Sequence, residues 1–440
     1  TIDSTSSKKC ATVSAPGKVL LAGGYLVLES PNVGLVIAAN KRFYCTIQEA
    51  EYSGDHQSQV IVRSPQFHSE WEYHIDHDDT TVSLQESEKN ASRNDFVEKT
   101  LRVAFSYIIA MGKDIPKSMI FTIQADNDFY SILPHLEGKP RTPKSVSTLP
   151  KFLPCPIDDQ GKAQVNKTGL GSSAALVSSM VGSILHFFDL PLDRAHNLAQ
   201  ICHCHAQGKV GSGFDVSAAV HGSQVFRTFS TQTLADFLTQ HLPNETTLKQ
   251  STLQSLKDTV ESTWEGGCVE KIGLSHGLKM ILADVCGGSE SPSMARQILA
   301  WKTSRNTTKE PFWEKLASIN PRIIQLLEDN DFEGLRVAFQ DARISLKQMG
   351  EAAGVPVEPD EQTMLADATS ALNGVVCCVV PGAGGYDALA CLYEGGEATK
   401  EKIGDLWANW NHNGTKICPL AVEAESAGGG LRIESNMFKA

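Results

Sequence analysis

The amino-acid sequence predicts an α+β protein built from two domains. Its 440 residues give room for two or three domains, each with a sizeable core. Apolar periodicity predicts strands mixed with helices in both halves of the chain, and a polar, irregular stretch at residues 230–277 lies between the halves. We therefore expect an N-terminal domain at residues 1–229 and a C-terminal domain at residues 230–440.

The first half mixes strands and helices. Apolar runs predict strands that cover residues 13–21, 42–49, 59–63, 71–75, 119–124 and 223–229. Apolar residues three or four apart predict helices that cover residues 94–111, 176–188, 193–206 and 216–221. Ser92 and Asn94 are both candidate caps for the first of these helices. Residues 134–161 carry six prolines and little periodicity, which predicts a long surface loop.

The second half shows a regular alternation of the two element types. Strands are predicted to cover residues 279–285, 374–380, 388–393, 416–422 and 430–434. Helices are predicted to cover residues 293–302, 311–329, 332–353, 360–372 and 398–410. This half is therefore expected to fold as a second α+β unit.

The chain is acidic overall, with 39 basic and 51 acidic residues and a net charge of −12. This charge disfavours nucleic acid and anionic membranes as partners, so an anionic substrate must be met by local cations. No run of about 18 apolar residues spans a bilayer, and the first residues lack the apolar core of a signal peptide. Eleven cysteines, spread through apolar segments, are typical of buried reduced thiols. We expect a soluble, cytoplasmic monomer.

Residues 167–175, which read Lys-Thr-Gly-Leu-Gly-Ser-Ser-Ala-Ala, predict a phosphate-binding loop before a helix. The first turn of a helix has N–H groups without a helical partner, and the helix dipole favours an anion there. Gly169 and Gly171 let the backbone approach that anion with no side chain between them. By itself, such a loop is as compatible with a turn and helix cap that bind no ligand as it is with a phosphate site.

Two other phosphate-binding motifs are excluded by the residues around this loop. The Walker pattern Gly-x-x-x-x-Gly-Lys-Ser/Thr does not occur in the sequence. The loop does match the dinucleotide pattern Gly-x-Gly-x-x-Ala, with Asp189 at about 20 residues further on. However, the preceding residues 161–167 are polar and do not predict a buried parallel strand. We therefore do not expect a dinucleotide-binding domain.

Three further glycine-rich motifs carry charged residues. Lys18 follows Ser-Ala-Pro-Gly at the start of an apolar strand, where a buried ammonium needs an anionic partner. Asp215 ends the string Gly-Lys-Val-Gly-Ser-Gly-Phe-Asp, where it either lies close to a ligand or caps a helix. Residues 381–387, Pro-Gly-Ala-Gly-Gly-Tyr-Asp, lie between two apolar strands and permit close approach of the backbone. Alone, this third motif is compatible with a plain loop.

A metal site at Cys202-His203-Cys204-His205 is not expected. These four residues fall within a predicted helix. Adjacent residues on a helix point in different directions and do not converge on one ion.

Taken together, the motifs resemble the superfamily of galactokinase, homoserine kinase, mevalonate kinase and phosphomevalonate kinase over nearly the whole chain. Residues 14–18, 167–175 and 381–387 resemble its first, second and third motifs, in the right order and separation. Residues 22–29, Ala-Gly-Gly-Tyr-Leu-Val-Leu-Glu, replace the Gly-Glu-His of mevalonate kinases and galactokinases. These residues and the string at residues 203–215 resemble the phosphomevalonate kinases of the eukaryotic, fungal-like type.

The resemblance implies a two-domain small-molecule kinase fold with its active site in the cleft between the domains. The N-terminal domain would be a ribosomal-protein-S5-like α/β domain that binds nucleotide, and the C-terminal domain a ferredoxin-like α+β domain. The implied reaction is phosphorylation of 5-phosphomevalonate to 5-diphosphomevalonate by ATP, with Mg²⁺ required. This reaction belongs to the mevalonate pathway of isoprenoid and sterol precursor synthesis.

The same resemblance assigns residues to roles in this chain. The expected catalytic residues are Lys18, Lys209 and Asp215. The residues expected to hold the ATP phosphates are Lys167, Gly169, Leu170, Gly171, Ser172, Ser173 and Ala174. The residues expected to bind the acceptor are Lys18, Lys209, Ser212, Ser289, Gly382, Ala383 and Gly384. The expected metal ligands are Ser173 and Asp215.

One departure from the superfamily leaves the metal ligands open. Several relatives place a second, metal-binding glutamate on the helix before the catalytic aspartate, but residues 194–214 contain no acidic residue. Either Asp215 and the phosphates complete the metal shell or water does, since Gln207 is a weak substitute for a carboxylate.

The role of Asp215 also stays open between a general base and an orienting residue. The acceptor is a phosphate monoester whose second pKa is about 6, so its attacking oxygen is mostly deprotonated at neutral pH. A general base then has little to remove, and we favour orientation of Lys18, Lys209 or the metal by Asp215.

Three competing functions remain on the sequence alone. One is another small-molecule kinase of the same superfamily, or the related decarboxylase. The second is a ligand-sensing regulator with this fold that has lost turnover. The third is a dinucleotide-binding oxidoreductase.

Overall fold

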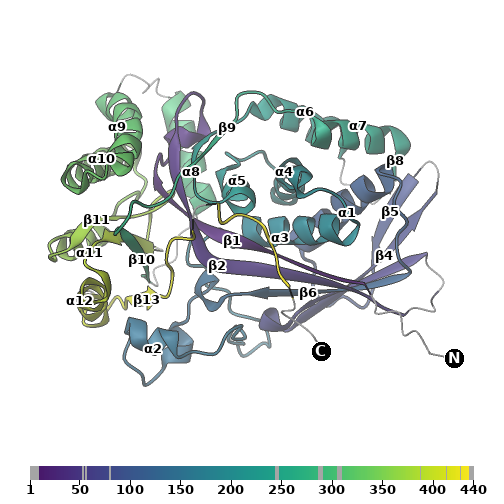
Figure 1. Ribbon diagram of the computed structural model, residues 1–440, viewed down its shortest axis with the longest axis horizontal. Helices are drawn as coiled ribbons and strands as arrows, with labels where there is room; N and C mark the ends of the chain where they lie inside the picture. Colours follow the sequence, from purple (N-terminus) through teal and green to yellow (C-terminus); the bar gives the residue numbers. More distant parts are fainter. Residues whose placement is uncertain are drawn as a thin grey trace.

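The computed structural model describes residues 9–51, 54, 57–78, 81–242, 247–285, 291–304, 310–386, 388–412, 414–426 and 428–435. Its strands form a sheet of ten strands and a sheet of four. Helices pack on both sheets, and the small sheet lies at one end of the molecule, to the left in Figure 1. The α+β fold class predicted from the sequence is confirmed.

The large sheet is built around its two longest strands, β1 (Cys10–Ala22) and β2 (Gly34–Glu49). The strand order is β14-β1-β2-β6-β3-β4-β5-β8, with β7 paired to β2 and β9 paired to β7. Among the described strands of this sheet, only β3 and β6 pair in parallel. The remaining strands are β3 (Ser58–Ser64), β4 (Ser69–His77), β5 (Thr81–Glu86), β6 (Ser118–Ala125), β7 (Gln224–Arg227), β8 (Thr247–Lys249), β9 (Cys268–Lys271) and β14 (Arg432–Ile433).

Helices cover one face of the large sheet in two layers (Figure 1). The inner layer holds α1 (Asp95–Ala110), α3 (Ser172–Phe187), α4 (Ala195–Gln207) and α5 (Phe214–His221). The outer layer holds α6 (Thr231–His241) and α7 (Gln250–Glu261). The helix α3 packs directly on β1 and β2, while α7 contacts α1 and α4. The strand β1 is therefore covered along most of its length.

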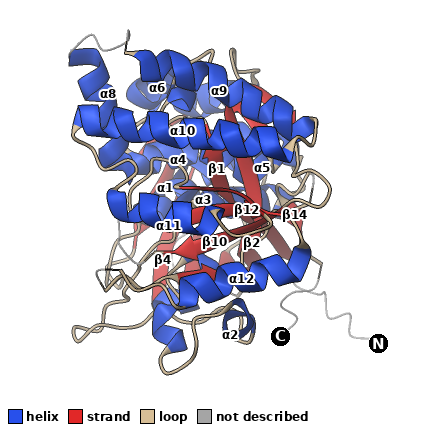
Figure 2. Ribbon diagram, turned by 90° about the vertical axis from the view of Figure 1, so that its left-hand side faces the viewer, coloured by secondary structure: helices blue, strands red, loops and turns tan. Residues whose placement is uncertain are grey.

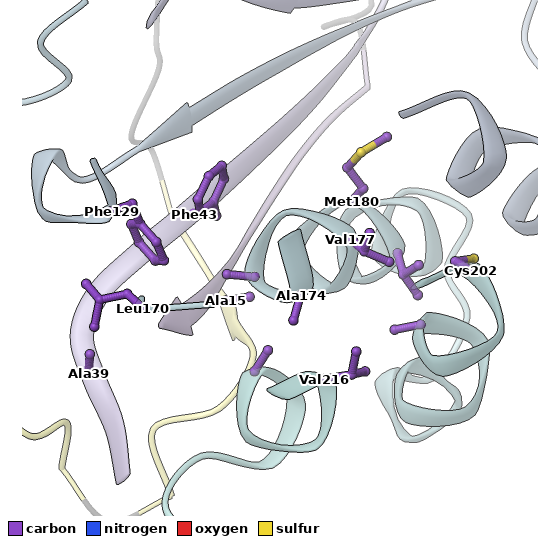
Figure 3. Close-up of a cluster of buried hydrophobic side chains, with 14 of the residues drawn as sticks. Ala15, Ala39, Phe43, Phe129, Leu170, Ala174, Val177, Met180, Cys202 and Val216 are labelled. Carbon is purple, nitrogen blue, oxygen red and sulfur yellow. The ribbon is translucent and has the colours of Figure 1, made fainter. Parts of the chain in front are cut away.

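One cluster of buried side chains joins β1, β2, the glycine-rich loop and α3 (Figure 3). The rings of Phe43 and Phe129 meet edge to face with 4.7 Å between their centroids. Leu170 of the glycine-rich loop and Ala174 of α3 are each 1% exposed within the same cluster. The loop is thus anchored by its own apolar residue in the core.

The small sheet has the order β11-β12-β10-β13, and its pairings are antiparallel. Its strands are β10 (Lys279–Asp284), β11 (Val375–Val379), β12 (Ala388–Tyr393) and β13 (Cys418–Leu420). Its helices are α8 (Ser291–Ser304), α9 (Pro311–Glu328), α10 (Phe332–Ala353), α11 (Asp360–Ser370) and α12 (Gly396–Ala408). The helices α10 and α11 contact β11, and α12 contacts β13. The helices α11 and α12 also contact β12, which is labelled with them in Figure 2.

The connections contain a few short helical turns. They are α2 (Pro143–Ser147), η1 (Leu26–Leu28), η2 (Pro65–Phe67), η3 (Asn127–Phe129), η4 (Leu133–Leu136) and η5 (Leu192–Arg194). Residues 134–161, predicted as a long loop, hold α2 and part of η4 and are otherwise irregular. Among the described helices, none is long and apolar enough to cross a membrane.

The predicted strands and helices are present. The largest shift is in β2, which begins at Gly34 rather than at residue 42. The helix α3 begins at Ser172 rather than at residue 176, so Ser172 and Ser173 lie in its first turn. Three strands were not predicted: β5, β8 and β9. In β9 all four residues are exposed, and β8 has three residues, so neither carries an apolar pattern of its own.

The boundary at residues 229 and 230 stays a prediction. The elements that follow it do not join the small sheet: β8 pairs with β5, β9 pairs with β7, and α7 packs on α1 and α4. Near the end of the chain, β14 pairs with β1. This packing favours assigning residues 230–271 and the C-terminal strand to the first domain.

The cap of α1 offers a direct test of the local structure. The Asn94 side chain accepts a hydrogen bond from the Val97 amide at 3.3 Å, whereas Ser92 lies two residues before this cap and is exposed. We expect Asn94→Ala to lower the free energy of unfolding by about 1 kcal/mol, because an amide in the first turn loses its acceptor. Ser92→Ala serves as the control, with an expected change below about 0.5 kcal/mol. Urea unfolding followed by circular dichroism measures both, and equal losses would contradict the assignment of the cap.

Candidate functional site

One cavity of about 370 Å³ brings the predicted motifs together. Its lining includes the predicted site residues Lys18, Lys167, Gly169, Leu170, Gly171, Ser172, Ser173, Lys209, Ser212, Asp215, Gly382, Ala383 and Gly384. Ala174 does not line it, since its side chain is 1% exposed and packs in the core. Ser289 and Asp387 lie outside the described residues. The cavity therefore collects segments that are more than 350 residues apart in the chain.

The phosphate cradle is the glycine-rich loop that leads into α3. Gly171 caps the helix with a left-handed φ of 74°, and the first helical bond of the backbone runs from the Ala175 amide to its carbonyl. A Cβ atom on Gly171 would lie 2.9 Å from Cε of Lys18, so this position admits no side chain. Gly169 has a φ of 80° and open space where a Cβ would stand. The arrangement leaves room for an anion over the first turn of α3.

Two hydrogen bonds join the phosphate cradle to η3. The Thr168 hydroxyl donates to the carbonyl of Asp128, and the Thr168 amide donates to that of Phe129. Lys167 makes an isolated bridge with Tyr130, and no strand precedes α3 within residues 131–171. The absence of a strand in this described segment agrees with the rejection of a dinucleotide-binding motif.

Lys18 lies half-buried against the cradle. Its Nζ donates to the carbonyl of Gly169 at 3.0 Å, and its amide donates to the carbonyl of Leu170 at 3.0 Å. The ammonium also lies 5.6 Å from the centroid of the Phe214 ring. Burial lowers the pKa of Lys18, while the charge of Asp215 acts in the opposite direction. Among the described cavity residues, Asp215 is therefore the carboxylate whose charge favours the ammonium form of Lys18.

Lys167 and Lys209 are the other cations of the cavity lining, and both are exposed. The Lys209 amide donates to the Cys204 carbonyl. This hydrogen bond closes the C-terminal end of α4, so Lys209 lies at the start of the next loop. Exposed ammonium groups on long side chains stay hydrated and can reach an incoming anion.

Asp215 lies in the first turn of α5, with Gly213 as the cap residue. Its Oδ1 accepts a hydrogen bond from the next amide, Val216, at 2.9 Å. The alternative that Asp215 caps the helix is therefore wrong. Its side chain is 25% exposed and contributes to the cavity wall.

His203 was not among the predicted site residues, yet it lies between two of them. Its Nε2 is 3.1 Å from Oγ of Ser173 and 3.9 Å from Oδ2 of Asp215. The amide nitrogen of Gln207 lies 3.3 Å from the same ring nitrogen. Burial lowers the pKa of His203, Asp215 acts in the opposite direction, and Lys167 and Lys209 lower it further. The imidazole is therefore neutral near pH 7.

His203 belongs to a polar stripe on the face of α4 that turns toward the site. The stripe consists of His196, Gln200, His203 and Gln207, at steps of four, three and four residues. The Gln200 amide donates to the Gly213 carbonyl at 2.8 Å and lies 3.3 Å from His196 Nε2. Helical spacing of polar residues along this segment was the signal in the sequence that could have revealed the stripe.

His205, two residues after His203 on α4, faces α1 instead of the cavity. Burial lowers the pKa of His205, and the Lys99 and Arg102 side chains of α1 lower it further, to about 4. Among the described residues, no group of three or more histidine, cysteine or acidic side chains is placed to hold a metal.

The loop after β11 is fastened to the end of β1. The Gly382 amide donates to the Leu20 carbonyl at 3.1 Å, and a Cβ on Gly24 would lie 2.7 Å from the Gly382 oxygen. The Tyr25 hydroxyl donates to the carbonyl of Ala383. Gly384 packs on the backbone of Val357, where a Cβ would overlap the carbonyl oxygen.

Tyr25 reaches this position through a strained turn. The Leu26 amide donates to the Gly24 carbonyl at 2.8 Å, which closes a γ-turn around Tyr25 with a φ of 67°. Such a backbone costs about 1–3 kcal/mol for a residue with a side chain. Burial of the Tyr25 ring and the hydrogen bond from its hydroxyl to the Ala383 carbonyl offset this strain.

Comparisons with known proteins find, over most of the chain, similarity to the same kinases that the sequence motifs resemble. The family model described as GHMP kinases N terminal domain matches residues 155–223. The phosphomevalonate kinase of Gibberella zeae is 37% identical and covers 96% of each chain. A protein of Arabidopsis thaliana named peroxisomal phosphomevalonate kinase is 33% identical over 90% of this chain and 92% of its own.

A solved structure shows the same fold. Streptococcus pneumoniae phosphomevalonate kinase in complex with phosphomevalonate and AMPPNP matches with a TM-score of 0.62 at 15% identity, over 96% of this chain and 99% of that chain. The fold, the order of the glycine-rich motifs and the identity to full-length relatives agree. This chain belongs to the phosphomevalonate kinase family of the GHMP kinases.

Proposed function

We propose that this protein transfers the γ-phosphoryl group of ATP to 5-phosphomevalonate and releases ADP and 5-diphosphomevalonate. A phosphate oxygen of the acceptor attacks the γ-phosphorus, and the bond from that phosphorus to the oxygen it shares with the β-phosphate breaks. The observation that carries the proposal is the convergence of four glycine-rich motifs on one cavity in a chain of this family.

Charge is the main obstacle to this reaction, because both substrates are anions. Two unit charges about 4 Å apart repel by about 4 kcal/mol at an effective dielectric of about 20. Lys18 lies against the cradle, and Lys167 and Lys209 lie on the same cavity wall. These three ammonium groups and the free amides of the first turn of α3 offset the repulsion.

Mg²⁺ fits the oxygen donors of the cavity. Ser173 and Asp215 both line the cavity, and Ser173 Oγ and Asp215 Oδ2 each lie within 4 Å of His203 Nε2, so the hydroxyl and the carboxylate belong to the same part of the wall. Mg²⁺ prefers oxygen ligands, and it takes one or two from protein beside substrate phosphates and water. Ser173 and Asp215 would hold it, and the bound ion would neutralise charge on the donor phosphates.

In this proposal, the Asp215 carboxylate acts on the nearby cations through its negative charge and does not remove a proton from the acceptor. The acceptor phosphate has a second pKa of about 6, so its oxygen is already ionised at neutral pH. Asp215 is the group whose charge raises the pKa of Lys18 against the effect of burial. Its charge therefore favours the protonated form of Lys18 beside the cradle.

The acceptor is proposed to bind between Lys18, Lys209 and Ser212 on one side and the loop of Gly382, Ala383 and Gly384 on the other. Ser289 is retained as a further candidate. The loop offers backbone groups with little side-chain bulk, which suits a small ligand. Tyr25 fixes this loop through the Ala383 carbonyl.

We also propose a cytoplasmic monomer that takes part in isoprenoid and sterol precursor synthesis, without nucleic-acid or membrane partners. The ten described cysteines are free thiols, and eight of them are buried, as is typical of a reducing compartment. The net charge of −12 disfavours anionic polymers and surfaces.

A panel of acceptors tests the proposed function. The protein is incubated with Mg-ATP and separately with mevalonate, phosphomevalonate, diphosphomevalonate, galactose or homoserine, and ADP release is measured. We expect release with phosphomevalonate, and loss of at least about a hundredfold in Lys18→Met, because a cation beside the donor phosphates is removed. ADP release with another acceptor instead would overturn the assignment. Binding of ATP without ADP release from any acceptor would indicate a regulator.

The pH dependence of Asp215→Asn tests the role of the carboxylate. We expect a lower kcat, by about a hundredfold, with the same shape of the pH profile as the wild type above pH 7, where the acceptor is ionised throughout. The measurement is kcat between pH 6 and 9 at saturating substrates. If the wild type shows an acid limb that Asp215→Asn lacks, the carboxylate acts as a general base.

Tyr25→Phe tests whether the loop of Gly382, Ala383 and Gly384 contacts the acceptor. Loss of the hydroxyl removes the bond to the Ala383 carbonyl, and we expect a rise in KM for phosphomevalonate of about fivefold to tenfold with KM for ATP unchanged. Tyr73→Phe is the matched control, because the buried Tyr73 hydroxyl has no hydrogen-bond partner in the structure. Equal effects on both KM values would place the loop outside the acceptor site.

A further inference from the structure

The polar stripe of α4 contributes Gln200, His203 and Gln207 to the wall of the cavity. No acidic residue lies between residues 194 and 214 of this chain. Instead His203, which is 3% exposed, fills the space between Ser173 on α3 and Asp215 on α5. A buried imidazole in contact with two proposed metal ligands calls for a role of its own.

The partners of His203 indicate how its ring is used. The side-chain nitrogen of Gln207 lies 3.3 Å from His203 Nε2, and Oγ of Ser173 lies 3.1 Å from the same ring nitrogen. In the neutral tautomer with its hydrogen on Nδ1, Nε2 is an acceptor, and the Gln207 amide and the Ser173 hydroxyl are the donors. The ring packs against Phe96 with 5.7 Å between centroids, which limits its rotation.

The direction of this hydrogen bond matters for the cradle. A serine hydroxyl that gives its hydrogen to His203 keeps both oxygen lone pairs for a cation on its other side. The same unprotonated nitrogen makes no charged pair with the Asp215 carboxylate at 3.9 Å.

We propose that His203 is a positioning residue, which accepts the hydrogen of the Ser173 hydroxyl and so turns the serine oxygen toward the cation of the bound nucleotide. This inference rests on the proposed function for the identity of the nucleotide and its Mg²⁺. Outer partners of metal ligands typically change metal affinity or activity by about tenfold to a hundredfold when removed.

The test measures nucleotide binding as well as turnover in the full chain. His203→Phe keeps a ring beside Phe96 but removes the acceptor. We expect it to raise the Kd for AMPPNP in the presence of Mg²⁺ about tenfold, with the Kd in EDTA unchanged within about twofold. We expect kcat to fall by a similar factor while KM for phosphomevalonate stays within about twofold. His203→Gln, whose amide oxygen can accept from Ser173, should recover most of the loss.

A double-mutant cycle with Ser173→Ala separates positioning from a general structural effect. If His203 acts through the serine, His203→Phe causes no further loss once Ser173→Ala is present. His205→Phe is the matched control, because this imidazole is buried on the same helix and its Nε2 has no hydrogen-bond partner in the structure. We expect it to leave Mg²⁺-dependent binding within about twofold of the wild type.

Several results would overturn the inference. They are additive losses in the cycle, equal losses with and without Mg²⁺, or a loss in His205→Phe as large as in His203→Phe. If His203→Phe does not fold, as judged by circular dichroism, His203→Asn replaces it, since its shorter amide ends before Ser173. Absence of turnover with phosphomevalonate in the wild type would reject the proposed function, while Mg²⁺-dependent AMPPNP binding would still decide the role of His203.

Discussion

The hydrogen bonds that β1 makes with two glycine-rich loops hold this site together. The Lys18 amide binds the Leu170 carbonyl, and the Leu20 carbonyl binds the Gly382 amide. A single strand therefore sets the distance between the phosphate cradle and the loop of the small sheet. Because β1 lies between β2 and β14 and is packed under α3, neither loop can shift without disturbing the core.

The same arrangement determines where the charged side chains of the cavity lie. Lys167 and Lys209 are exposed and stay hydrated, whereas Lys18 is held against the cradle, where burial lowers its pKa and the charge of Asp215 acts in the opposite direction. Asp215 is the only acidic side chain among the described lining residues. The wall made by α4 is polar and neutral, so it satisfies hydrogen bonds without adding a buried charge that would need a counter-ion.

Much of this could be predicted from the sequence because the signals are local. Helical spacing located α1, α3, α4 and the helices of the small sheet, and glycines with charged neighbours marked each loop of the cavity. The strands β8 and β9 could not be predicted, because short or exposed strands acquire their hydrogen bonds only from partners distant in the chain. His203 was missed for a related reason: its importance comes from Ser173 and Asp215, which lie on two other helices.

The sequence by itself determined the element types, the glycines with left-handed backbone and the family to which the chain belongs, since each depends on residue type and spacing within a short segment. The tertiary structure alone decided which groups meet. It paired β8 and β9 with strands of the large sheet, bound Tyr25 to Ala383 and set an imidazole beside the cradle. Such contacts depend on packing between distant segments, and no local pattern specifies them.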